Sequence, residues 1–136
     1  MKRMNLLFIG LILISLTFVG TAQSQNNDAQ ASIKANSNVE VYYFHMTRRC
    51  LTCQAVEDVT KEALKEFYGD KVPFSGYNLD EDTGKEKGES LDISGQTLVI
   101  VSGDSKINIT NEGFMYARSN PDKLKQLIKE KVDALL

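Results

Sequence analysis

The residues best suited to chemistry are Cys50 and Cys53, the only two cysteines of the chain. A pair at positions i and i+3 on the opening turn of a helix can close a small disulfide with little backbone movement. In disulfide exchange a thiolate attacks, and a neighbouring thiol then resolves the mixed disulfide. The spacing therefore predicts a Cys50–Cys53 disulfide that can open and close.

Ionisable neighbours surround this pair. Arg48 and Arg49 come directly before Cys50, and their charges, together with the helix N-terminus, should favour a thiolate there. His45, the only histidine, lies five residues before Cys50. Since imidazole titrates near neutral pH, His45 could accept a proton from Cys53 or tune Cys50. We therefore include these three side chains in the candidate site.

Two other interpretations of the cysteine pair remain open. A structural disulfide is one, although such a short loop restricts the unfolded chain little. The other is a soft-metal site, in which Cys50, Cys53 and His45 would bind copper or zinc. No second C-x-x-C and no further histidine completes a closed metal site. Redox exchange is the favoured interpretation, and no metal is assigned.

Alternating periodicities indicate the elements that position the pair. Apolar residues three and four apart predict a helix over 51–68, which Gly69 ends. A later helix is expected to open at 119–122, where a capping residue precedes Pro121. Runs rich in β-branched and aromatic residues predict strands over 39–46, 72–79, 97–102 and 106–110. The cysteines thus lie where the first strand passes into the first helix.

The order of these elements predicts an α/β fold. Strand, helix and strand at the start imply a parallel crossover, and a turn at Gly103 adds an antiparallel pair. Residues 80–92 are charged and contain Gly84 and Gly88, so any helix there should be short and weak. We expect a central mixed β-sheet with helices on both faces.

With C-x-x-C opening its first helix, this pattern resembles the thioredoxin-like family over residues 39–136. Residues 77–80 resemble the end of that family's second strand, and residues 93–98 resemble the loop before its third strand. The resemblance implies that Cys50 is the nucleophile and Cys53 the resolving cysteine.

The chain departs from the family pattern near the cysteines. Gln96 stands where the family usually carries a cis-proline, and Arg49 stands where a tryptophan is common. The first strand has no counterpart of the family's buried acid. We expect the Gln96 amide to hydrogen-bond a bound peptide, which adds this residue to the candidate site.

The first 22 residues have the pattern of a signal peptide. Lys2 and Arg3 precede an apolar run over 6–19, and small residues follow at Gly20 and Ala22. The run is shorter than the roughly 20 residues that span a bilayer, so we expect cleavage after Ala22 and no stable membrane insertion afterwards. Residues 23–38 are polar and predict a flexible leader.

Composition limits the remaining possibilities. A length of 136 residues allows one ordinary domain, expected over 39–136, and 16 basic against 18 acidic residues give no surface that attracts nucleic acid. The favoured interpretation is a periplasmic or secreted thiol–disulfide oxidoreductase without a cofactor. It would act on protein thiols and disulfides, and a membrane redox partner would reset it. The alternatives are a copper or zinc carrier and a non-catalytic binding module with a structural disulfide.

Overall fold

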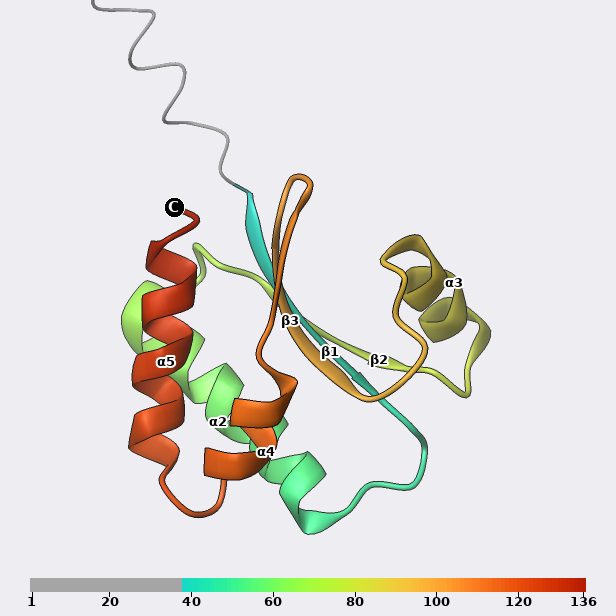
Figure 1. Cartoon of the computed structure of the whole chain (residues 1–136), viewed down its shortest axis with the longest axis horizontal. Coiled ribbons are helices and arrows are strands. Elements are labelled where there is room, and N and C mark those ends of the chain that lie inside the picture. Colours follow the sequence, from blue (N-terminus) through green and yellow to red (C-terminus); the bar gives the residue numbers. More distant parts are fainter. Residues whose placement is uncertain (1–37) are drawn as a thin grey trace, which may run out of the picture. The chain divides into compact units, whose positions relative to one another are not determined.

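The computed structural model describes residues 38–136, which form a sheet with helices packed against it (Figure 1). The predicted signal peptide over 1–22 and the leader up to residue 37 lie outside the described residues. The strands are β1 (Val39–His45), β2 (Phe74–Asn78), β3 (Thr97–Ser102) and β4 (Ser105–Asn108). The helices are α2 (Leu51–Tyr68), α3 (Asp82–Ser90), α4 (Thr110–Tyr116) and α5 (Pro121–Asp133).

The sheet has the order β2-β1-β3-β4 and mixes both pairing directions. Strand β1 pairs with β2 in parallel, with Val41 opposite Phe74. On its other edge β1 pairs with β3 in the antiparallel direction. Strands β3 and β4 form a hairpin whose turn holds Gly103 at a φ of +56°, a conformation that favours glycine. The predicted parallel crossover, the hairpin and the mixed sheet are therefore confirmed.

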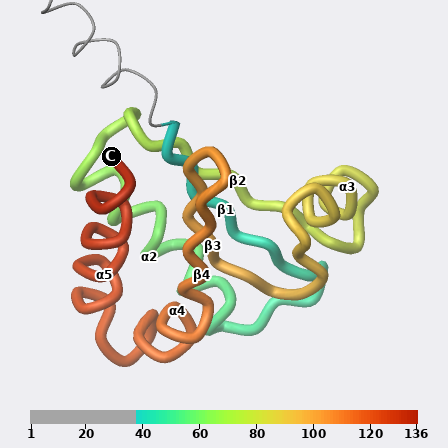
Figure 2. Tube along the Cα trace, turned by 45° about the horizontal axis from the view of Figure 1, so that its top comes forward, coloured from blue at the N-terminus to red at the C-terminus, as the bar shows by residue number. Residues whose placement is uncertain are grey.

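Helices α2, α4 and α5 cover one face of the sheet (Figures 1 and 2). The main core lies between them and the strands, because the apolar stripes of α2 and α5 are directed inward. Its fully buried members come from every layer: Val41, Tyr43, Val56, Ala63, Leu98, Ile100, Leu124, Ile128 and Val132. This core fixes the start of α2, and with it the cysteine pair, against the sheet.

Helix α3 and its flanking loops lie on the opposite face (Figure 1), over a smaller cluster of Tyr42, Phe44, Leu79 and Val99. As expected, α3 is short, and it contains no large apolar residue. Its buried glycines instead allow the backbone to approach closely, since a Cβ on Gly84 would lie 1.8 Å from the carbonyl oxygen of Asn78. Helices thus cover both faces, as the sequence predicts.

Helix α4 was not predicted from the sequence. The fourth strand ends at Asn108 instead of residue 110, because the Asn108 side chain accepts a hydrogen bond of 3.0 Å from the Thr110 N–H and turns the chain. A helix of seven residues is too short to show a clear apolar period. None of the helices within residues 38–136 is long and apolar enough to cross a membrane.

Candidate active site

Cys50 and Cys53 form a disulfide at the start of α2, with their Cα atoms 5.0 Å apart. Cys50 is the N-cap of the helix, and its sulfur accepts a hydrogen bond of 3.1 Å from the Cys53 N–H. The two cysteines differ in exposure, because Cys50 is exposed whereas Cys53 is only 3% exposed. Cys50 is thus the cysteine that a bulky thiol can reach. Its sulfur also accepts a hydrogen bond from one of the backbone N–H groups at the start of α2 that have no partner within the helix.

The loop before Cys50 is anchored to the segment that follows β2. The Thr47 N–H donates to Asp80 Oδ2 at 2.7 Å, and Asn78 Nδ2 donates to Thr47 Oγ1 at 3.0 Å. The hydrogen bond from the Thr47 backbone lowers the pKa of Asp80, which therefore remains an acceptor at neutral pH. Leu79 N–H also donates to the carbonyl of His45 at 2.8 Å. These bonds fix the chain on the way into the disulfide.

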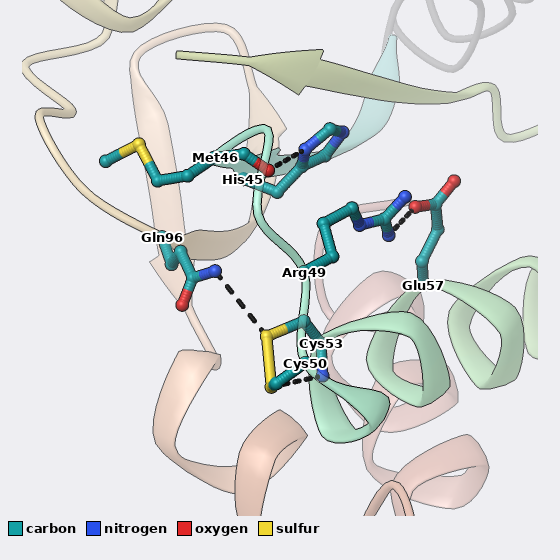
Figure 3. The surroundings of a disulfide bond; sticks show 7 residues. All are labelled: His45, Met46, Arg49, Cys50, Cys53, Glu57 and Gln96. Carbon is teal, nitrogen blue, oxygen red and sulfur yellow. Dashed lines mark hydrogen bonds and ion pairs between the residues drawn. A yellow bond between two sulfur atoms is a disulfide. The ribbon is translucent and has the colours of Figure 1, made fainter. Parts of the chain in front are cut away.

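Gln96 reaches the disulfide from the segment just before β3 (Figure 3). Its Nε2 lies 3.6 Å from Cys53 Sγ and donates a hydrogen bond to that sulfur. The structure therefore brings together three of the six predicted site residues: Cys50, Cys53 and Gln96.

Arg49 points away from the disulfide (Figure 3). Its guanidinium forms an ion pair with Glu57, which also accepts a hydrogen bond of 2.5 Å from Lys61. Burial alone would raise the pKa of Glu57, but the hydrogen bonds from Lys61 and Arg49 lower it overall. Glu57 therefore remains a carboxylate and balances the charge of Arg49. The guanidinium also lies over the Tyr43 ring, 6.0 Å from its centroid, and burial raises the pKa of Tyr43 to about 12.

His45 is likewise turned away from the cysteines (Figure 3). Its Nδ1 donates to the carbonyl oxygen of Met46 at 3.0 Å, and its ring packs beside Tyr43. Arg48 is exposed on the loop. Within residues 38–136, no three His, Cys, Asp or Glu side chains are grouped to hold a metal ion. The structure thus does not bring His45 or the Arg49 side chain to the sulfurs, and the roles of His45, Arg48 and Arg49 stay predictions.

Arg48 and Arg49 are expected to have only a modest influence on the reactivity of Cys50. The double change Arg48→Ala with Arg49→Ala should raise the pKa of the reduced Cys50 thiol and slow its alkylation near neutral pH. We expect the alkylation rate to fall by about threefold or less, because Arg48 is exposed to solvent and the charge of Arg49 is paired with Glu57. The rate of iodoacetamide modification, followed against pH, measures this change in Cys50 reactivity. Raised salt should slow the alkylation of the wild type in part, because it screens the same charges.

A matched control removes two positive charges far from the cysteines, through Lys65→Ala in the last turn of α2 and Lys71→Ala just after the helix. Lys65 lies about 22 Å along the helix axis from Cys50, because it follows Cys50 by 15 residues and a helix rises about 1.5 Å per residue. The control should leave the alkylation profile unchanged. Superimposable profiles for the arginine variant and the wild type would show that both arginines are solvated or structural charges.

Two parts of the site were missed by sequence reasoning. Glu57 gave no signal as the partner of Arg49, because one residue precedes α2 and the other lies two turns inside it. The Thr47–Asp80 contact joins residues 33 apart. An acidic residue directly after a strand, next to the predicted site in the fold, was the available signal for Asp80.

No protein-family model matches the sequence, and no curated protein matches it significantly. Solved structures do match. Thioredoxin O2 of Arabidopsis thaliana in its oxidised state superposes with a TM-score of 0.51 at 23% identity, covering 76% of this chain and 84% of its own. A thioredoxin of Malassezia sympodialis, Mala s 13, has a TM-score of 0.50 at 23% identity with the same coverage.

A third structure, Trxlp from Edwardsiella tarda EIB202, has a TM-score of 0.50 at 14% identity and covers 75% of this chain and 92% of its own. Identities this low establish the fold alone. The described part of the chain therefore has a thioredoxin-like fold, as its sequence pattern predicts.

Proposed function

We propose that this protein is a thiol–disulfide oxidoreductase that exchanges disulfides through Cys50 and Cys53. The observation that carries the proposal is the asymmetry of the disulfide, in which Cys50 is exposed at the N-cap of α2 and Cys53 is 3% exposed. A structural disulfide would gain nothing from an exposed sulfur at a helix N-terminus. The thioredoxin-like fold around the pair adds support.

The exchange has two directions that use the same atoms. In reduction of a substrate, the Cys50 thiolate attacks a substrate disulfide and forms a mixed disulfide, and Cys53 then attacks the sulfur of Cys50 and releases the second substrate thiolate. The helix N-terminus and the Cys53 N–H favour the thiolate of Cys50 in the first step. Oxidation of a substrate runs through the same intermediate in reverse.

The substrates proposed are protein thiols and disulfides. Leu51, directly after Cys50, is 68% exposed, so a polypeptide that binds at Cys50 would meet an apolar side chain beside the reactive sulfur. A membrane redox partner is proposed to reset the pair, because each turnover leaves Cys50 and Cys53 in the opposite redox state.

A redox titration against glutathione tests the proposal. We expect the purified protein to pass reversibly between a dithiol and a disulfide, with a reduction potential above about −300 mV, because structural disulfides lie below that value. Mass spectrometry after alkylation counts the thiols at each ratio of reduced to oxidised glutathione. A pair that stays oxidised throughout would identify a structural disulfide and refute the redox function.

Export to the periplasm or the exterior is proposed from the sequence of residues 1–22, which lie outside the described residues. The positive start, the apolar run and Ala22 support it. In an oxidising compartment a disulfide such as Cys50–Cys53 persists between turnovers. N-terminal sequencing of the protein recovered after expression tests it, since cleavage after Ala22 leaves Gln23 first.

A further inference from the structure

The two sulfurs of the disulfide have different hydrogen-bond donors (Figure 3). Cys50 Sγ accepts from the backbone N–H of Cys53 at 3.1 Å, whereas Cys53 Sγ accepts from the side-chain Nε2 of Gln96 at 3.6 Å. The first donor belongs to the helix that carries the pair. The second comes from a residue 43 positions later in the chain, directly before strand β3.

We propose that Gln96 is a catalytic hydrogen-bond donor whose side-chain amide stabilises the negative charge on the Cys53 sulfur whenever the Cys50–Cys53 bond opens or closes. This role rests on the proposed redox function and deepens it. It differs from binding a peptide, because the donor acts on a reacting atom of the protein itself.

The step on which Gln96 acts is balanced in atoms and electrons. A substrate thiolate attacks Cys50 Sγ, a bond forms between the substrate sulfur and Cys50, and the Cys50–Cys53 bond breaks. The electron pair of that bond leaves on Cys53, which is reduced to a thiolate while the substrate sulfur is oxidised to the disulfide level. In the reverse step the Cys53 thiolate attacks Cys50 and expels the substrate thiolate.

The burial of Cys53 is the reason that it needs a donor. The residue Cys53 is only 3% exposed and is therefore almost removed from water, and an unpaired charge in such a place is costly. Hydrogen bonds to a charged atom are stronger than those between neutral groups. The amide of Gln96 therefore stabilises the thiolate more than it stabilises the disulfide or the thiol.

The donor is held in place before the reaction begins. Thr97, the next residue, pairs with Phe44 in the sheet, and its hydroxyl donates to the carbonyl of Gly95 at 2.9 Å. The backbone on both sides of Gln96 is therefore fixed. A preorganised donor needs no rearrangement as charge develops on the sulfur.

The test uses the reduced protein mixed rapidly with an aromatic disulfide of thionitrobenzoate. Attack by Cys50 releases one coloured thiolate, and closure by Cys53 releases the second, so the second phase reports Cys53 alone. We compare wild type with Gln96→Met, which is similar in size and lacks the donor, and with Gln96→Glu, which places a negative charge there.

For Gln96→Met we expect the pH midpoint of the second phase to rise by about one unit, because the thiolate loses a hydrogen bond. The two rate profiles should also cross. At pH values below both midpoints, the second phase of the variant should be about threefold slower than that of wild type, because the smaller fraction of Cys53 thiolate outweighs its higher nucleophilicity. At pH values above both midpoints, Cys53 is a thiolate in both proteins, and the more nucleophilic thiolate of the variant should react about threefold faster. Gln96→Glu should raise the midpoint further.

Gln126→Met, the same change at an exposed position on α5, is the control and should follow the wild-type profile. A crossing of the profiles is the signature, because a purely structural disturbance would slow the second phase at every pH. Profiles of both Gln96 variants that superimpose on the wild type, or that fall uniformly below it, overturn the role of Gln96. If the wild type gives no second phase, the redox function itself fails, and the role fails with it.

Discussion

Replacing Cys53 with serine is expected to leave Cys50 covalently joined to its substrates, whereas replacing Cys50 with serine should abolish this joining. The exposed Cys50 can still attack a disulfide when Cys53 is absent, but no thiol remains to resolve the product. In the opposite variant the remaining cysteine is Cys53, a residue that is 3% exposed in the structure, so a protein substrate should reach it poorly.

The measurement is the amount of mixed disulfide after each reduced variant is incubated with an oxidised protein, read by mass and on a non-reducing gel. We expect Cys53→Ser to trap at least about tenfold more than Cys50→Ser. The double serine variant sets the background. Equal trapping by the two single variants, or trapping by neither, would contradict the assignment of Cys50 as nucleophile.

The same variants separate exchange from metal carriage. A copper or zinc carrier would bind its metal stoichiometrically as the reduced wild type, and both single variants would lose it together. An exchange enzyme instead gives the unequal result described above, because its two cysteines have different tasks.

Gly84→Ala is expected to destabilise the fold by about 3 kcal/mol or more. A Cβ at this position would lie 1.8 Å from the carbonyl oxygen of Asn78 and 2.5 Å from its carbonyl carbon. Both atoms belong to the backbone and cannot rotate away, so helix α3 or the end of β2 must move. Overpacking of this kind costs about 1–3 kcal/mol even where flexible side chains can yield. Urea unfolding gives the free-energy difference.

The control is Gly95→Ala, because a Cβ there has no atom within 4 Å. We expect its free energy of unfolding to stay within about 1 kcal/mol of wild type. Gly84→Ala should also loosen the site, since Asn78 and Asp80 hold Thr47 in the loop before Cys50. A Gly84→Ala protein as stable as Gly95→Ala would mean that α3 is not packed as closely as the structure has it.

The sequence was sufficient for the fold class and for the reactive pair, because those signals are local. The helix over 51–68 was found with both of its ends, since its apolar period is long and Gly69 stops it. The short distance between Cys50 and Cys53 made a disulfide possible in any fold that begins a helix there. Helix α4 was not predicted, because seven residues are too few to show the apolar period of a helix.

Only the tertiary structure decided which charges and donors reach the sulfurs. By sequence, His45 and Arg49 both lie within five residues of Cys50, yet their side chains are directed elsewhere, Arg49 to Glu57 and His45 to the carbonyl of Met46. Gln96, distant in sequence, donates to Cys53 because β3 lies beside β1 in the sheet. Side-chain direction depends on packing partners from other elements, and such partners leave no trace in local spacing.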